Sequence, residues 1–179
     1  MSSDTPSERL DVNGMVAVVT GGAGGIGKGI VTALLQRGAT VVIADIEADT
    51  TQATVAELSD LGPVSGWPTD VADEGSVAAL ANYVYEAHGR CNLLFNNAGV
   101  TSGGGGKPWE QEPNDWRWCF SVNVFGVAIC TTEFVPRMLA GGEPGQIINT
   151  SSGDGGFAPV PTASVYAASK AAVSCFTET

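Results

Sequence analysis

Short runs of consecutive apolar residues alternate along the chain with longer stretches in which apolar residues recur every three or four positions. Uninterrupted apolar runs are typical of strands buried on both faces of a parallel sheet, and the longer pattern is typical of amphipathic helices. The pattern predicts strands at residues 16–20, 40–44, 64–69, 92–96 and 146–150, and helices at residues 26–37, 47–61, 74–88, 115–140 and 165–179. Because strands and helices alternate, we expect βαβ units and a Rossmann-type, doubly wound parallel sheet of the α/β class.

Individual residues refine this picture at the ends of the predicted elements. Gly66 and Pro68 interrupt the third strand, and because proline cannot donate to a neighbouring strand, this one is expected at an edge of the sheet. Asp73 precedes the third helix and is predicted to cap it. Pro136 lies within the fourth helix and predicts a kink there. Right-handed crossovers place the first strand centrally and the ligand at the carboxyl ends of the strands.

The chain of 179 residues, 44% of them apolar, is long enough for a hydrophobic core. We expect residues 1–179 to form a single domain. The polar residues 1–8 are predicted to be a disordered tail. The glycines at residues 103–106 are predicted to form a flexible loop.

The formal net charge of −11, with only 8 basic residues, argues against binding to nucleic acids or to anionic membranes. Nucleic-acid binders neutralise phosphates with lysine and arginine, and adsorption to anionic membranes needs the same side chains, so neither partner is expected. We expect no apolar run of the length of a membrane span and no secretory signal. The four cysteines form no C-x-x-C pair, which favours a reducing, cytoplasmic location and no metal site.

Glycines follow the first predicted strand directly and precede a helix. Gly22, Gly24 and Gly27 have the G-x-G-x-x-G spacing of dinucleotide-binding turns. Glycine lets the backbone approach a ligand closely, and the N-terminus of the following helix attracts anions. The stretch therefore predicts a pyrophosphate cradle, and the alternative is a turn that is merely flexible.

Asp45 ends the second predicted strand, 18 positions beyond Gly27. A carboxylate at this place can accept hydrogen bonds from an adenosine ribose and repel a 2′-phosphate, which favours NAD over NADP as the cofactor. The alternative interpretation is that Asp45 caps the following helix.

Tyr166 and Lys170 lie four positions apart and share one face if residues 165–179 are helical. An ammonium at roughly 4 Å stabilises a phenolate by about 4 kcal/mol at an effective dielectric near 20. Such a pair can serve as general base for an alcohol or general acid for a carbonyl, although the same spacing also occurs on solvated helix faces. Ser151 and Ser152 follow the fifth strand, where a hydroxyl can donate to a substrate oxygen or stabilise a turn.

Several of these residues belong to ordered motifs that together resemble the short-chain dehydrogenase/reductase family, classical type. TGGAGGIG at residues 20–27 resembles its T-G-x3-G-x-G turn, TDV its adenine-contacting aspartate motif, NNAG its N-N-A-G motif, and YAASK its Y-x3-K motif. The resemblance implies cofactor contacts from Gly21, Gly25, Ile26, Gly27, Asp45, Asp70, Val71, Asn97, Ala98, Gly99, Tyr166 and Lys170.

The resemblance also implies an activity, namely hydride transfer between NAD(H) and a secondary alcohol or its ketone. By analogy Tyr166 is the acid/base, Lys170 supports it and holds the nicotinamide ribose, and Asn123 supports a water relay. A serine polarises the carbonyl, and we assign Ser152, although Ser152 and Tyr166 are one residue further apart than is usual in the family. A homodimer or homotetramer formed through the two last helices is implied as well.

Members of the family run to roughly 250 residues, so the resemblance implies a chain that lacks the last strands of the family fold. The alternative function is therefore a truncated, non-catalytic nucleotide-binding fragment. A further alternative is an epimerase or dehydratase of the extended branch, whose T-G-x2-G-x2-G turn is matched by Gly21, Gly24 and Gly27. The N-N-A-G motif favours the classical branch.

Overall fold

The computed structural model describes residues 11–101, 106–158 and 161–179. The tail predicted at residues 1–8 and most of the predicted glycine loop lie outside these ranges. The strands are β1 (Val16–Thr20), β2 (Thr40–Asp45), β3 (Val64–Pro68), β4 (Leu93–Asn96) and β5 (Gln146–Asn149). The α-helices are α1 (Gly25–Leu35), α2 (Ala48–Leu58), α3 (Glu74–His88), α4 (Pro113–Phe120), α5 (Gly126–Gly141) and α6 (Ser164–Thr177), with short helical turns η1 (Ser59–Leu61), η2 (Pro108–Glu110), η3 (Ser121–Phe125) and η4 (Gly153–Gly155).

The five strands form one parallel sheet in the order β3-β2-β1-β4-β5. The predicted α/β class, the central first strand and the edge position of β3 are thereby confirmed. Because the chain passes from β1 outward to β3 and then back across to β4, the strand order reverses beside β1. Ligands of doubly wound sheets bind at such a reversal, outside the carboxyl ends of the strands.

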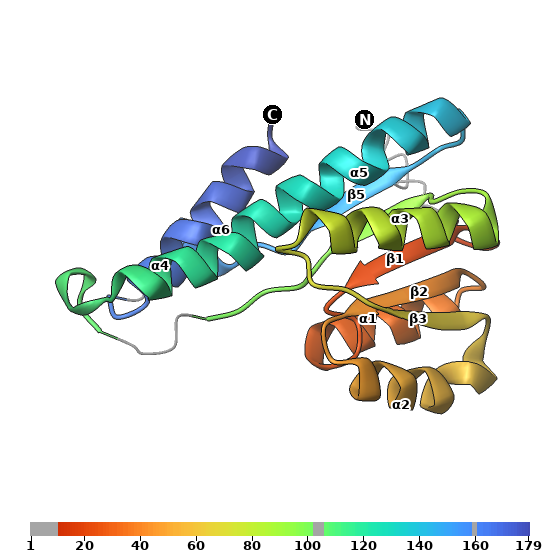
Figure 1. Ribbon diagram of the computed structural model, residues 1–179, viewed down its shortest axis with the longest axis horizontal. Helices are drawn as coiled ribbons and strands as arrows, with labels where there is room; N and C mark the ends of the chain where they lie inside the picture. The colour runs from red at the N-terminus through yellow and green to blue at the C-terminus, as the bar shows by residue number, and fades with distance from the viewer. Residues whose placement is uncertain (1–10, 102–105, 159–160) are drawn as a thin grey trace, which may run out of the picture.

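Alternate residues of the central strand face two separate apolar layers. Val16 and Val18 pack in a cluster with buried side chains of α3 and α5, whereas Ala17 and Val19 pack with those of α1 and α2. Both faces of β1 are therefore covered, which explains its uninterrupted apolar sequence. Figure 1 shows α1 and α2 on one side of the sheet and α3 and α5 on the other.

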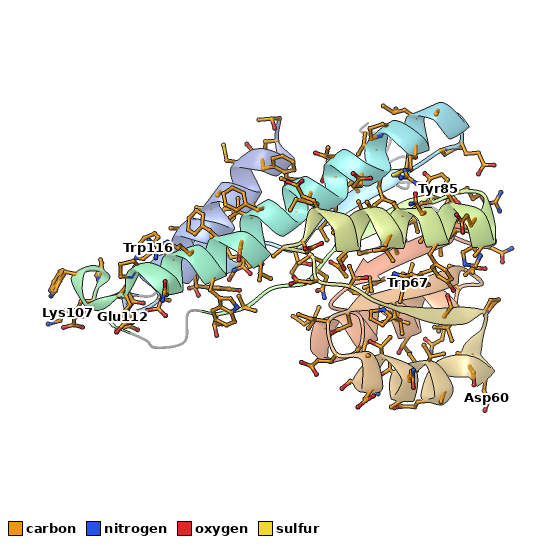
Figure 2. All side chains as sticks on the ribbon, viewed as in Figure 1. Asp60, Trp67, Tyr85, Lys107, Glu112 and Trp116 are labelled. Carbon is orange, nitrogen blue, oxygen red and sulfur yellow. The ribbon has the colours of Figure 1, made fainter. Side chains whose placement is uncertain are left out.

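Stacked aromatic rings join the edge strand β3 to helix α3. Trp67 of β3 stacks on Tyr83 with their ring centroids 4.4 Å apart, and Figure 2 labels Trp67 beside α3. Asp73 caps the same helix, as predicted, by accepting a hydrogen bond of 2.6 Å from the backbone of Ser76. The weak, interrupted strand is thus secured by the helix that follows it.

The helix predicted at residues 115–140 is longer and less regular than the periodicity indicates. It begins at Pro113, contains the π-helical turn η3, and ends at Gly141, with Gly142 in the left-handed region at φ +68°. Pro136 lies inside α5. The resulting helical stretch runs diagonally past the sheet in Figure 1.

The same stretch, Pro113–Gly141, reaches a mean hydropathy of 1.4 and is long and apolar enough to cross a membrane. The expectation that no apolar run has this length was therefore wrong. In the fold, Cys130 and Phe134 of this helix are buried in the cluster shared with α3 and the sheet. A core helix of a globular protein can have the same length and hydropathy, because it too carries an apolar face.

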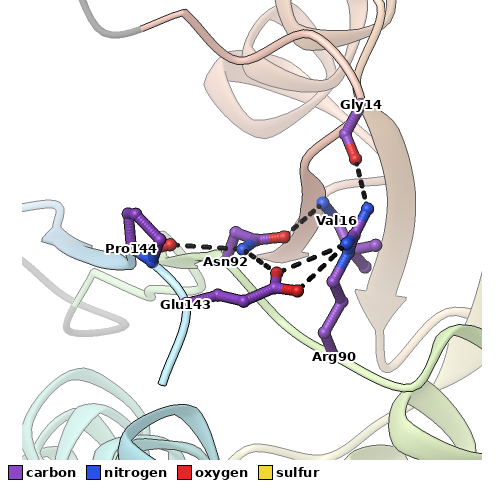
Figure 3. A network of polar contacts seen from close by, with 6 residues as sticks. All are labelled: Gly14, Val16, Arg90, Asn92, Glu143 and Pro144. Carbon is purple, nitrogen blue, oxygen red and sulfur yellow. Dashed lines mark hydrogen bonds and ion pairs between the residues drawn. The ribbon is translucent and has the colours of Figure 1, made fainter. Parts of the chain in front are cut away.

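A polar network fastens the amino ends of the strands (Figure 3). The side chain of Asn92 accepts a hydrogen bond from Val16 N at 3.0 Å and donates to Glu143 at 3.1 Å and to the backbone of Pro144 at 3.2 Å. Arg90 donates to Glu143 at 3.2 Å. The hydrogen bond from Asn92 and the Arg90 charge hold the pKa of the Glu143 carboxyl below its ordinary value.

Candidate active site

A cavity of about 660 Å³ opens at the carboxyl ends of the strands. It lies within the size range of small-molecule and cofactor pockets. Eleven of the predicted site residues line it: Gly21, Ile26, Gly27, Asp45, Asp70, Val71, Asn97, Ala98, Gly99, Tyr166 and Lys170. The other three, Gly25, Asn123 and Ser152, are not among the lining residues. In the described part of the chain, no group of His, Cys, Asp and Glu side chains could hold a metal ion.

The backbone of the glycine turn shows which glycines are required there. Gly21 has φ +62°, and a Cβ atom on it would lie 2.8 Å from the Cα of Ala98. Gly25 has φ +50°, which is the left-handed region. Gly24, in contrast, is extended with φ −150°, and a Cβ there would meet nothing within 4 Å. The conformation therefore favours the Gly21–Gly25–Gly27 spacing over both spacings that use Gly24.

Asp45 stands at the end of β2 and lines the cavity. Its carboxylate accepts hydrogen bonds from Ala23 N at 3.0 Å and Glu47 N at 3.2 Å, which joins the glycine turn to the end of β2. The alternative role of Asp45 as a helix cap is wrong, because α2 begins at Ala48 and its N-cap residue is Glu47. Since Asp70 also lines the cavity, this end of it is acidic.

The N-N-A-G segment joins β4 to the turn after β1. The hydroxyl of Thr20 accepts hydrogen bonds of 3.0 Å from the backbone of Asn97 and Ala98. The side-chain amide of Asn97 donates to the carbonyls of Thr20 at 3.1 Å and Gly21 at 3.2 Å. These bonds explain why this segment lines the cavity, and they show that the Asn97 amide fixes the glycine turn.

Helix α6 carries the tyrosine and the lysine on one face, as predicted. The Lys170 ammonium lies 5.7 Å from the centroid of the Tyr166 ring and donates a hydrogen bond of 2.8 Å to the carbonyl of Thr150. The side chain of Lys170 is buried, with 4% of the residue exposed. Burial lowers the pKa of Lys170, and the nearby Cys119 opposes this shift. Among the described residues that line the cavity, Lys170 is the only basic one.

The side chain of Asn123 is buried beneath the cavity wall and clamps the loop after β4. Its Oδ1 accepts from Val100 N at 2.8 Å, and its Nδ2 donates to the carbonyl of Val100 at 2.9 Å. Asn123 lies in the π-helical turn η3, and such turns are frequent at functional sites. The geometry thus gives the Asn123 side chain a positioning role rather than a contact with the cavity.

The two serines after β5 have different partners. The hydroxyl of Ser151 donates to the carbonyl of Lys170 at 3.0 Å and lies 2.6 Å from that of Ser174, so it holds α6. The hydroxyl oxygen of Ser152 accepts from Asp154 N at 3.2 Å. This bond does not use the hydroxyl hydrogen of Ser152, so that hydrogen can be donated to a substrate oxygen.

Several residues of the cavity wall were not predicted from the sequence. Thr150 follows β5, so the rule that ligands lie at the carboxyl ends of strands could have found it. Val100, Trp118 and Val122 also line the cavity. No sequence signal separates Trp118 from Trp116, which Figure 2 labels beside α4. The ring of Trp116 packs on Phe120 of the same helix, with the two centroids 5.9 Å apart.

The reversed strand order, the left-handed glycine turn and the acidic strand end are features of a Rossmann-type α/β sheet. The chain belongs to the short-chain dehydrogenase/reductase family, since the family profile described as short chain dehydrogenase matches residues 15–179. The resemblance drawn from the sequence motifs is thereby confirmed.

Individual relatives agree with this membership. The chain is 41% identical over 165 residues to a C alpha-dehydrogenase from Sphingobium sp., which covers 90% of this chain and 53% of the relative. A short-chain dehydrogenase/reductase from Burkholderia phymatum in complex with NAD superposes with a TM-score of 0.90 at 41% identity, covering 95% of this chain and 60% of that one. A metagenomic short-chain oxidoreductase in complex with NADP gives a TM-score of 0.86 at 34% identity, covering 94% and 76%. The chain therefore spans about half the length of the curated relative and a larger share of the two structures.

Proposed function

We propose that this chain belongs to an oxidoreductase that transfers a hydride between NAD(H) and a secondary alcohol or ketone. The observation that carries the proposal is the Tyr166–Lys170 pair, which lines the same cavity as the glycine turn and the acidic end of β2. A solvated helix face would leave the lysine in water, whereas Lys170 is buried and bonded to a backbone carbonyl.

The chain's own side chains account for the proton chemistry and the positioning. A bound nicotinamide would supply the hydride acceptor or donor. Tyr166 gives a proton to the substrate oxygen during reduction and removes it during oxidation. The Lys170 ammonium favours the ionised phenol, and Ser152 donates a hydrogen bond to the oxygen on which charge develops.

NAD rather than NADP is the proposed cofactor, although the relatives include structures with either one. Support comes from the acidic side chains of Asp45 and Glu47, which both line the cavity at the end of β2. A 2′-phosphate placed there would meet like charge and would lack a basic partner.

The homodimer or homotetramer implied by the resemblance is also a proposal for this chain. It is supported by two exposed aromatic side chains, Phe125 of η3 at 58% and Phe176 of α6 at 40%.

The test of the proposed function is the substitution Tyr166→Phe, which removes the phenol oxygen and keeps the ring. General acid–base groups contribute about 100-fold to 10,000-fold, so kcat measured by NADH absorbance with a panel of secondary alcohols should fall at least about 100-fold. The affinity for NADH should stay within about twofold, because the substitution leaves the glycine turn and Asp45 untouched.

The control compares Ser152→Ala with Ser151→Ala in the same assay, and we expect the larger loss of kcat for Ser152→Ala. Turnover that survives Tyr166→Phe would overturn the proposal. Binding of NADH without turnover by the unaltered chain would instead favour the non-catalytic nucleotide-binding alternative.

A further inference from the structure

Ser169 lies between Tyr166 and Lys170 in sequence but points away from the cavity into the core, with 0% of the residue exposed. Its hydroxyl donates to the carbonyl of Tyr166 at 2.7 Å. The same oxygen accepts from Asn123 Nδ2 at 2.9 Å and from the Cys119 thiol at 3.6 Å. A hydroxyl has one hydrogen to donate and two lone pairs to accept with, so all the bonding capacity of Ser169 is used.

The bond from Asn123 connects α6 with the opposite wall of the cavity. The second hydrogen of Asn123 Nδ2 is donated to the carbonyl of Val100 at 2.9 Å, and Asn123 Oδ1 accepts from Val100 N at 2.8 Å. Val100 lines the cavity and directly follows Gly99, on which a Cβ atom would lie 3.3 Å from the Lys170 ammonium. A continuous series of hydrogen bonds therefore runs from the backbone of α6 through Ser169 and Asn123 to this loop.

The cysteine in this cluster is a neutral donor and a second acceptor. Burial raises the pKa of the Cys119 thiol, and the hydrogen bond to Ser169 and the Lys170 charge only partly oppose the shift. The Cys119 sulfur lies 3.3 Å from Asn123 Nδ2, where it is an alternative acceptor for one of the two amide hydrogens. It can therefore keep part of the Asn123 bonding if Ser169 is lost.

We propose that Ser169 is a positioning residue, which fixes the register of α6 against the Asn123–Val100 clamp and thereby sets the distance between the Tyr166–Lys170 pair and the facing loop. Apolar burial alone would fix the position of a small side chain at this place less closely, because the hydrophobic effect is non-directional. A fully bonded buried hydroxyl permits only one arrangement, since any shift leaves a polar group without a partner.

The first test measures amide hydrogen exchange in the full chain by NMR, with the core amide of Val42 as internal reference. In Ser169→Ala, exchange at Val100 should become about tenfold faster relative to Val42, because the clamp loses its anchor on α6. The matched control is Ser174→Ala, which removes another hydroxyl of α6 and should leave the ratio unchanged. If Ser169→Ala does not fold, Ser169→Cys keeps a weak acceptor of similar size and should give an intermediate increase.

The second test is kinetic and rests on the proposed function. Ser169→Ala should lower kcat about tenfold and leave the affinity for NADH within about twofold, whereas Ser174→Ala, which leaves the Asn123–Val100 clamp intact, should lower kcat less. Adding Cys119→Ala to Ser169→Ala should raise Val100 exchange further. Equal exchange rates at Val100 in Ser169→Ala and Ser174→Ala would overturn the inference. If Ser169→Ala does not fold, the inference would be overturned by a Val100 exchange rate in Ser169→Cys equal to that of the unaltered protein. Absence of turnover in every variant would contradict the proposed function but leave the exchange result readable.

Discussion

Lys170 shows most directly how single residues set the chemistry of the cavity. The ammonium is nearly removed from water, yet it has a carbonyl partner at 2.8 Å and an aromatic ring 5.7 Å away. Burial disfavours the charged form, so the pKa of Lys170 lies below its ordinary value of 10.5. Burial of the charged Lys170 side chain therefore lowers the stability of the fold, and it places a positive charge beside the Tyr166 phenol.

This cost predicts a specific dependence of stability on pH. Because the folded-state pKa is lowered, the cost of the charged lysine is fully present below that pKa and vanishes as the pH rises through the unfolded value of 10.5. The free energy of unfolding of the unaltered protein should therefore rise relative to that of Lys170→Met as the pH increases from neutral toward 10.5.

Urea unfolding at a series of pH values measures this difference. Lys28→Met serves as the control for net charge, since Lys28 pairs with Glu57 at the surface, and its difference from the unaltered protein should vary less over the same range. A difference for Lys170→Met that stays flat or falls with rising pH would contradict the prediction.

At the residue scale, the sequence could predict groups whose roles follow from spacing. Two residues four positions apart, such as Tyr166 and Lys170, share one face of any helix. Asp45 directly follows an apolar run, so it is expected at the end of a strand. The different hydrogen-bond partners of Ser151 and Ser152 could not be predicted, because they depend on which hydroxyl reaches the backbone of α6. Asn123 was predicted from a motif, but its burial under Val100 is a tertiary contact.

Among the elements, the turn between β1 and α1 depends most on backbone conformation. Gly25 is left-handed while Gly24 is extended, although the two are neighbours in the same glycine run. A left-handed conformation costs a residue with a Cβ atom about 1–2 kcal/mol, whereas an extended conformation is open to any residue. The two glycines therefore form a natural matched pair.

We predict that Gly25→Ala lowers the free energy of unfolding by about 1–2 kcal/mol. Gly24→Ala should change it by less than about 1 kcal/mol, and in the stabilising direction, because alanine has less freedom in the unfolded chain. Urea unfolding of both variants checks the prediction. Equal losses in the two variants would mean that the turn is not held in the conformation described.

The long helix shows what periodicity alone cannot provide at the element scale. Apolar spacing predicted one helix at residues 115–140, but the π-helical turn η3 interrupts it at Ser121–Phe125. The extra residue per turn accompanies the tertiary bonds of Asn123 to Val100 and Ser169. Those partners lie 23 and 46 positions away in sequence, so no local pattern contains them.

For the whole molecule, the sheet order brings together residues that are distant in the sequence. The carboxyl ends of β1, β2, β4 and β5 meet around one cavity, so the glycine turn, Asp45, the N-N-A-G segment and Thr150 become neighbours. Alternating strands and helices predicted the parallel sheet and its central first strand, but the full strand order comes only from the structure. The cavity is thus a property of the assembled sheet, because no single element supplies its whole lining.

Binding of the cofactor should accordingly stabilise the entire fold. NADH at 100 times its dissociation constant should raise the free energy of unfolding by about 2.7 kcal/mol, and the melting temperature by roughly 5 °C or more. NADPH at the same concentration should give a clearly smaller shift, because Asp45 and Glu47 lie at the end of β2. Thermal unfolding followed by circular dichroism measures both shifts, and equal shifts would contradict the assignment of NAD.

The network of Arg90, Asn92 and Glu143 ties the strands together at the end of the sheet remote from the cavity. The contacts that join the amino ends of the strands are therefore separate from the residues that line the cavity at their carboxyl ends. Substitutions of Arg90 or Glu143 could therefore alter the thermal stability of the protein without altering the shape of the cavity.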